Sequence, residues 1–591
     1  MSNFRLKPRS ELSAALAADS RQAFVGVALF SALLNVLYLT GSFYMLEVYD
    51  RVLPSRSVPT LVGITLLALI LFSIQGVFDI VRSRILVRVG SSLDEAVSER
   101  VHHVLMKLPL KGSASLGMQP LRDLDQIRSF LSSVGPAALF DLPWMPLYLG
   151  ICYLFHPLIG IAATAGGLVL VVVALLTELL TRAPSTEAAH LVGSRNSLAE
   201  ANRRNTEVVH AMGMAGRLGS LWSDCNRRCL AAQQRTADIA AGLGGLSKIL
   251  RIALQSGVLG IGAWLVINQQ ATAGIIIASS ILTSRTLAPI ELAISQWRGF
   301  VAARQSWRRL NEILGKMPAD QARMALPKPV HSLAVEAASI VPPGTNRVVV
   351  HDMAFQLKAG QGLGIIGASA SGKSSLARAI VGVWTAARGK ICIDGAALEQ
   401  WPSEALGPHI GYLPQDMELF AGTVAENISR FEPQPSSEVV IAAATAAGVH
   451  ELVLGLPDGY ETQIGEAGAA LSAGQRQRIG LARALYGEPF LVVLDEPNAN
   501  LDNEGEEALT RAILGVRARG GIAIVIAHRP SALAGVDTLL VMRAGRLESF
   551  GPKKAMVKQA LQAEATPVRL VARAQGAAFH DTTSERSPAL H

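Results

Sequence analysis

Apolar residues are distributed unevenly along this chain of 591 residues. Long runs almost free of charge crowd the first half, whereas the second half alternates short apolar runs with polar and glycine-containing turns. A helix needs about 20 mostly apolar residues to cross a bilayer. Six stretches of that kind lie near residues 23–45, 59–80, 134–155, 157–180, 249–267 and 271–294. The pattern predicts six membrane-spanning helices followed by an α/β domain.

The charges indicate how the spans are oriented. Only 17% of residues are charged, too few for an ordinary soluble enzyme, and the net charge is +8. Lysine and arginine gather in the two long segments between spans two and three and between spans four and five. Because positively charged loops stay in the cytoplasm, both segments, the N-terminus and the second half are predicted to be cytoplasmic. Membrane orientation therefore explains the positive charge, and we expect contact with membrane lipid and none with nucleic acid. Both segments are expected to continue the spans as helices.

Five charged residues lie within or near the predicted spans, namely Asp79, Asp141, Glu178, Arg285 and Glu291. A charge at the centre of a membrane costs about 2.5–3.5 kcal/mol. We therefore expect these residues to face a polar cavity or an interface, or to lie at helix ends beyond the hydrocarbon. None of them is assigned to substrate contact.

The sequence GLGIIGASASGKSSLARAI at 362–380 places a short apolar strand before a loop of small residues and a helix. This is the context of a P-loop, in which backbone N–H groups surround the phosphates of ATP, a lysine reaches the β- and γ-phosphates, and a hydroxyl holds Mg²⁺. The predicted ATP-binding residues are Gly367, Ala368, Ser369, Ala370, Ser371, Gly372, Lys373, Ser374 and Ser375. Lys373 is also predicted to be catalytic and Ser374 to be a Mg²⁺ ligand.

A second apolar strand, FLVVLDE at 490–496, ends in two carboxylates. A carboxylate at a strand end that faces the P-loop supplies a second protein contact for Mg²⁺, and we assign this role to Asp495. Glu496, one residue further, is predicted to polarise the attacking water, because phosphoryl transfer mainly needs positioning and charge stabilisation.

The segment LSAGQRQRIGLARAL at 471–485 resembles the signature of the ABC ATPase family. In that family two ATPase domains pack head to tail, and the signature of one closes over the ATP held by the other. The resemblance implies that Ser472, Gly474 and Gln475 contact the partner's nucleotide. A helix N-terminus, whose dipole favours the γ-phosphate, suits this role.

The remaining family positions follow in order. Gln415 in GYLPQD resembles the glutamine that touches Mg²⁺ or water, and Asp502 in NANLD resembles the D-loop aspartate. His528 in VIAHRP resembles the switch histidine on the γ-phosphate, which makes it a predicted catalytic residue.

Two positions depart from the family pattern. Ala473 replaces a glycine in the signature, and we expect activity to survive because the loop stays small. The aromatic residue that stacks on adenine is missing, because residues 339–344 read SIVPPG. Losing that stack removes about 1–3 kcal/mol, so we expect weaker ATP affinity or relaxed base preference.

Three segments in the membrane half indicate a particular branch of the ABC family. YMLEVYDRVLPSRSVPTL at 44–61, LFDLPWMPLYL at 139–149 and RRNTEVVHAMGM at 203–214 resemble bacterial type I secretion exporters, nearest the alkaline-protease (PrtD-type) branch. The resemblance implies an inner-membrane exporter of unfolded polypeptides with C-terminal signals. It also implies a periplasmic membrane fusion (adaptor) protein and a TolC-type outer-membrane channel as partners.

The expected fold is a six-span α-helical membrane domain fused to a P-loop α/β domain, and one copy of each requires a second chain, most simply a homodimer. A lipid or drug exporter, or an ATP-gated channel or scaffold, are the alternatives. The expected parts are a cytoplasmic segment at 1–21, the membrane domain with its cytoplasmic extensions at 22–316, a linker at 317–332, the ATPase domain at 333–560 and a disordered tail at 561–591.

Overall fold

The computed structural model describes residues 11–112, 117–317, 326–527 and 529–556. It divides into two compact units, residues 1–320 and 321–591. Half of the predicted linker, the whole predicted tail and His528 lie outside the described residues. The predicted boundary at residue 22 lies inside a helix, because the first helix begins at Glu11.

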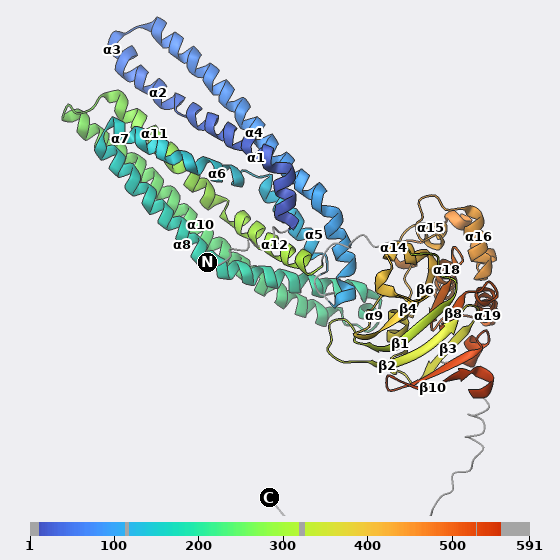
Figure 1. Cartoon of the computed structure of the whole chain (residues 1–591). Helices are drawn as coiled ribbons and strands as arrows, with labels where there is room; N and C mark the ends of the chain where they lie inside the picture. Colours follow the sequence, from blue (N-terminus) through green and yellow to red (C-terminus); the bar gives the residue numbers. More distant parts are fainter. Residues whose placement is uncertain (1–10, 113–116, 318–325, 528, 557–591) are drawn as a thin grey trace, which may run out of the picture. The chain divides into compact units, whose positions relative to one another are not determined.

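The first unit is built from helices, and three of them are much longer than a bilayer is thick (Figure 1). These are α4 (Val58–Lys107), α8 (Pro157–Arg204) and α10 (Ala215–Ile267), with 50, 48 and 53 residues. At about 1.5 Å per residue each is roughly 70–80 Å long, against a hydrocarbon core of about 30 Å. The prediction that the spans continue as helices beyond the membrane is therefore confirmed.

The other helices of this unit are α1 (Glu11–Leu37), α2 (Thr40–Glu47), the π-helix η1 (Val48–Val52), α3 (Leu53–Ser55), α5 (Gln119–Leu131), α6 (Gly135–Asp141), α7 (Met145–Phe155), α9 (Thr206–Ala211), α11 (Ala273–Ser295) and α12 (Trp297–Lys316). Within the described residues, six helical segments are long and apolar enough to cross a membrane. They coincide with the six predicted spans and confirm them. In space α8 packs along α10, and α1 packs along α4.

Polar side chains define where several of these helices begin. The side chain of Ser57 accepts a hydrogen bond from the Thr60 amide at the start of α4, and Thr272 does the same for the Ile275 amide at the start of α11. Such caps satisfy amides that have no partner inside the helix. At α11 the carboxylate of Asp50, from η1, adds a hydrogen bond from the Gly274 amide at 2.8 Å. Gly274 has to be small, because a Cβ there would lie 2.6 Å from Asp50.

The first span is interrupted between α1 and α2. The Leu39 amide donates to the Val36 carbonyl instead of the Asn35 carbonyl, one turn back. The Asn35 carbonyl accepts a hydrogen bond from the Tyr148 hydroxyl at 2.8 Å, and the same hydroxyl is 2.8 Å from the Asn35 side-chain oxygen. Inside a membrane a freed backbone group needs such a partner, because no water replaces it.

A buried ion pair lies beside this interruption. Arg82 on α4 donates to both carboxylate oxygens of Asp141 at 3.0 and 3.1 Å, and both side chains are about nine-tenths buried. Asn35 donates to the same carboxylate at 2.9 Å, and Arg82 also pairs with Asp79 at 2.7 Å. Helices α1, α4 and α6 are thus joined by one polar network.

Four of the five charged residues predicted within or near the spans have an ion-pair partner among the described residues, Asp79 and Asp141 sharing Arg82. Glu178 pairs with Arg304 at 2.8 Å, and Glu291 pairs with Arg251 at 2.8 Å. Arg285 lies 4.6 Å from the centre of the Tyr38 ring. Asp141 lies at the interface of α1, α4 and α6, one of the expected settings, and pairing with Arg82 compensates the cost of removing its carboxylate from water.

The second unit holds two sheets. A six-stranded sheet has the order β10-β9-β3-β8-β7-β6, parallel except for β10, and a four-stranded antiparallel sheet has the order β2-β1-β4-β5. The strands are β1 (Ser332–Ile340), β2 (Val350–Lys358), β3 (Gly362–Gly367), β4 (Arg388–Ile393), β5 (Ala396–Ala397), β6 (Ile410–Leu413), β7 (Leu491–Asp495), β8 (Ile522–Ile526), β9 (Thr538–Arg543) and β10 (Arg546–Pro552).

Helices pack against these sheets. They are α13 (Lys373–Ile380), α14 (Ser403–Leu406), α15 (Val424–Ile428), α16 (Ser437–Ala446), α17 (His450–Leu454), α18 (Ala473–Leu485) and α19 (Asn503–Ala518). β7 and β8 are buried at every position, as expected of central parallel strands covered on both faces. Functional residues in such a sheet gather at the carboxyl ends of the strands.

The Arg82–Asp141 pair makes the first testable prediction. Arg82→Leu leaves the Asp141 carboxylate buried without its cation, which we expect to cost about 3–5 kcal/mol and to lower the thermal unfolding midpoint of the purified protein in detergent. Replacing both residues by leucine should restore part of that loss. The control is Arg51→Ala, because its pair with Glu47 is exposed and should matter little. A double variant less stable than Arg82→Leu would contradict this account.

Candidate functional site

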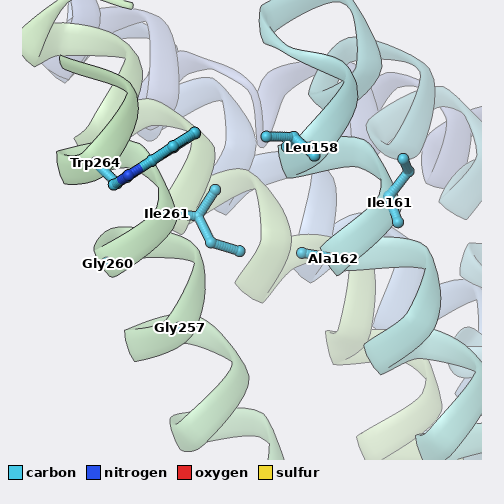
Figure 2. A pocket seen from close by; sticks show the side chains of 7 residues that line it. All are labelled: Leu158, Ile161, Ala162, Gly257, Gly260, Ile261 and Trp264. Atoms are coloured by element: carbon cyan, nitrogen blue, oxygen red, sulfur yellow. The ribbon is translucent and has the colours of Figure 1, made fainter. Parts of the chain in front are cut away.

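An apolar hollow in the first unit lies between α8 and α10 (Figure 2). Its volume is about 550 Å³, and Leu158, Ile161 and Trp264 are among its lining side chains. Gly257 and Gly260 leave room on the α10 side. Since no charged group lines it, this hollow offers contact to hydrocarbon and none to phosphate. The candidate chemistry lies in the second unit.

The P-loop connects β3 to α13 as predicted. Gly372 is the N-cap of α13 with φ +95°, and Ala370 has φ +62°, so the loop bends through two left-handed residues. A Cβ at Gly372 would lie 2.9 Å from the Val349 carbonyl, which makes glycine necessary there. Residues 368–370 at the tip of the loop are exposed, and the N-terminus of α13 lies directly behind them. This arrangement suits an anion.

Lys373 lies inside the loop that it follows. Its Nζ donates to the carbonyls of Gly367 and Ala368 at 3.0 and 2.9 Å. Burial lowers the pKa of the Lys373 ammonium, and the nearby carboxylates of Glu496 and Asp495 partly oppose that shift. The lysine, both carboxylates and the P-loop therefore lie in one place, as the sequence predicts.

Asp495 ends β7 and is 1% exposed. Among the described residues, neither of its carboxylate oxygens has a hydrogen-bond partner. Burial raises the pKa of this carboxyl, whereas the neighbouring Ser374 hydroxyl and the charges of Arg378 and Lys373 lower it. A buried carboxylate with unused oxygens beside a serine hydroxyl is the donor set that Mg²⁺ prefers, so these residues fit the predicted metal ion.

Glu496 follows in a left-handed backbone conformation with φ +53°. Its amide donates to the Ile526 carbonyl at the end of β8 at 2.9 Å. The side-chain amide of Gln415 donates to the Glu496 carboxylate at 3.2 Å. The structure thus brings together the predicted base and the predicted Mg²⁺-contacting glutamine, which are 81 residues apart in sequence.

The signature residues begin α18. Ser472 is its N-cap and accepts from the Gln475 amide at 3.2 Å, while the Gln475 side chain accepts from the Ser472 amide at 2.8 Å. This reciprocal pair is a capping box, and the S-x-x-Q spacing in the sequence could have predicted it. Among the residues that the structure describes, none of the hydrogen bonds of Ser472 or Gln475 reaches the P-loop.

Asp502 caps the following helix, α19. Its carboxylate accepts from the Gly505 amide at 2.9 Å and pairs with Arg478 of α18. These contacts, with the Gly505 amide first, hold the pKa of the Asp502 carboxyl below its usual value. The D-loop aspartate is therefore fixed to the signature helix of its own chain.

Sequence reasoning missed two polar residues next to Glu496. Gln477, on the buried side of α18, donates to the Pro497 carbonyl at 2.8 Å, and Asn500 donates to Gln477 at 3.1 Å. The second glutamine of the signature was visible in the sequence, but its partners were not. His528, the predicted switch histidine, lies outside the described residues.

The adenine end is bounded by residues 341–349, which join β1 to β2. Val341, Pro342 and Pro343 are half-buried, and residues 344–347 are exposed. The far end of this connection meets the P-loop, since the Val349 carbonyl lies next to Gly372. The connection carries no aromatic residue.

Comparison with known proteins gives the following. The model of the ABC transporter family matches residues 350–499, and that of the ABC transporter transmembrane region matches residues 24–290. The type I secretion system ATP-binding protein PrsD of Rhizobium meliloti is 58% identical over 94% of this chain and 96% of its own length. The alpha-hemolysin translocation ATP-binding protein HlyB of Escherichia coli is 28% identical over 91% of this chain and 77% of its own length.

A solved structure shares the fold. A bacterial Atm1-family ABC exporter with ATP bound matches with a TM-score of 0.77 and 22% identity, covering 93% of this chain and 99% of that one. This likeness shows that the chain has the fold of an ABC exporter.

The second prediction concerns the missing aromatic residue in the connection between β1 and β2. Pro342→Tyr should tighten ATP binding, because a stacked ring contributes about 1–3 kcal/mol, and should sharpen selectivity for ATP over GTP. Competition binding with labelled ATP measures both. Asn346→Tyr, in the exposed part of the same connection, is the matched control and should change neither. Tight ATP binding with strict selectivity over GTP in the unmodified protein would contradict the prediction.

Proposed function

This chain belongs to the type I secretion exporters of the ABC transporter family, and from this premise we propose that it exports unfolded polypeptides with C-terminal signals. It is a multi-pass inner-membrane protein with a cytoplasmic ATPase domain. Its ATP hydrolysis is coupled to transport. The observation that carries the proposal is the 58% identity to PrsD along almost the whole chain.

The proposed roles at the ATP site are supported by the geometry of the described residues and, for His528, by the sequence resemblance. The P-loop residues 367–375 would surround the phosphates, and Lys373 would reach the β- and γ-phosphates. Ser374, Asp495 and Gln415 would hold Mg²⁺, which when bound neutralises charge on the phosphates. Glu496 orients the water and accepts its proton. His528 contacts the γ-phosphate.

The proposed working unit is a homodimer. One chain carries six spans and one ATPase domain, which is half of an exporter. Ser472, Gly474 and Gln475 of one chain would close over the ATP held by the other. Support comes from the start of α18, where Ser472 is exposed and bonded to its own helix instead of the P-loop. A closed two-fold pair then makes both sites equivalent.

The proposed partners are those of a type I secretion pathway. They are a periplasmic membrane fusion (adaptor) protein, a TolC-type outer-membrane channel and the secreted polypeptide. Support comes from the two relatives, a type I secretion system ATP-binding protein and an alpha-hemolysin translocation ATP-binding protein.

Hydrolysis provides the third prediction. Glu496→Gln keeps the shape of the side chain but removes the base, so phosphate release by the purified dimer should fall roughly 100-fold or more, while ATP binding persists. Glu451→Gln, on the exposed side of α17, is the matched control. Equal rates of phosphate release for Glu496→Gln and the unmodified protein would show that Glu496 is not the catalytic base.

Transport provides the fourth prediction. Cells that carry Lys373→Ala, which lacks the phosphate-contacting ammonium, should lose at least one secreted polypeptide from the culture supernatant. Comparing the supernatant proteins of these cells with those of cells carrying the unmodified chain measures the loss. An unchanged set of secreted proteins would favour a lipid or drug exporter instead.

A further inference from the structure

Gln477 is a buried amide whose three hydrogen bonds all go to one loop. It lies in the first half of α18 and is 7% exposed. Its Nε2 donates to the carbonyls of Pro497 and Glu496 at 2.8 and 3.3 Å, and its Oε1 accepts from Asn500 at 3.1 Å. A buried amide so fully paired fixes the groups to which it bonds.

The loop that Gln477 holds has a strained backbone conformation at Glu496, the residue proposed as the catalytic base. Glu496 has φ +53°, a conformation that costs a non-glycine residue about 1–3 kcal/mol and persists only where the surroundings enforce it. The Glu496 amide is fixed by the Ile526 carbonyl, and the Glu496 carbonyl is fixed by Gln477. These two contacts, from opposite sides of the residue, set the direction in which its carboxylate points.

The same helix holds the rest of this loop. Gly474 packs so closely on the Asn500 carbonyl that a Cβ there would lie 3.0 Å from it. One turn further, Arg478 pairs with Asp502. The start of α18 and the loop 496–502 therefore form one rigid piece, which carries signature residues at one end and Glu496 at the other.

We propose that Gln477 is a positioning residue for ATP hydrolysis, which holds Glu496 of its own chain in the orientation needed to accept the proton of water. One part of this inference rests on the proposed dimer. In that dimer the start of α18 touches the ATP bound by the other chain. Gln477 would then link the signature contact at the other chain's ATP site to the alignment of Glu496 at its own chain's ATP site.

Mixed dimers separate this role from a general effect on stability. Two differently tagged copies are expressed together and the heterodimer is purified through both tags. One copy carries Glu496→Gln, so a single intact base remains. Gln477→Leu, similar in volume but without hydrogen bonds, is placed either on the chain with the intact Glu496 or on the other chain. Phosphate release is then measured in a single turnover.

We expect Gln477→Leu on the chain with the intact Glu496 to slow the single turnover roughly 10- to 100-fold, as a small misplacement of a catalytic group does, with unchanged ATP affinity. On the other chain it should have little effect. Gln477→Glu, which keeps an acceptor for Asn500 but loses the donor to both carbonyls, should resemble leucine.

The matched control is Asn427→Leu. Asn427 is also a fully buried amide, but it bonds to the carbonyls of Phe420 and Thr423, away from the loop 496–502. It should lower stability without any difference between the two chain arrangements.

Two outcomes would overturn the proposal. In the first, Gln477→Leu slows the single turnover equally on either chain. In the second, it slows the single turnover on neither chain. The reference heterodimer, with Glu496→Gln on one chain only, distinguishes a failure of the proposed function. If both its sites hydrolyse in the single turnover, Glu496 is not the base, and the roles of Glu496 and Gln477 fall together. If only one site hydrolyses and Gln477→Leu has no effect, only the role of Gln477 falls.

Discussion

Every backbone amide and carbonyl removed from water must find a partner, and this requirement shapes both units. In hydrocarbon it permits helices and little else, which is why all six spans are helical. Where a backbone carbonyl has no backbone partner, a side chain donates a hydrogen bond to it. Tyr148 serves the carbonyl freed in the first span, and Gln477 serves the carbonyls beside Glu496. Both side chains are buried, and the local sequence pattern did not reveal the partners of either.

The sequence predicts what depends on neighbours along the chain. Runs of apolar residues located the six spans, and the strand, loop and helix pattern around Lys373 located the P-loop, because each is a local property. Contacts between distant residues were beyond reach. Arg82 and Asp141 are 59 residues apart, and nothing in either segment shows that they meet. The sequence left open whether Asp141 faces a polar cavity or an interface or lies at a helix end, because only the folded arrangement of α4 and α6 supplies the cation.

The nucleotide site shows the same division between local and distant information. Its phosphate end is built from backbone geometry that small residues make possible, so residue types alone identify it. The residues predicted to act in hydrolysis and Mg²⁺ binding, Asp495, Glu496 and Gln415, meet because β6, β7, β8 and β3 lie in one parallel sheet. The connection 341–349 next to the P-loop carries no aromatic residue, so the sequence predicts only apolar contact with adenine, from Val341 or Pro342.

The interruption of the first span changes how that span carries load. A continuous helix passes torsion from end to end through its ladder of hydrogen bonds, but the ladder stops at Leu39. Below the break, Asn35 ties α1 to Asp141. Beyond it, α2 leads into η1, where Asp50 is bonded to the start of α11. The two parts of the span are therefore hydrogen-bonded to different neighbours, α1 to Asp141 at the end of α6 and η1 to the start of α11.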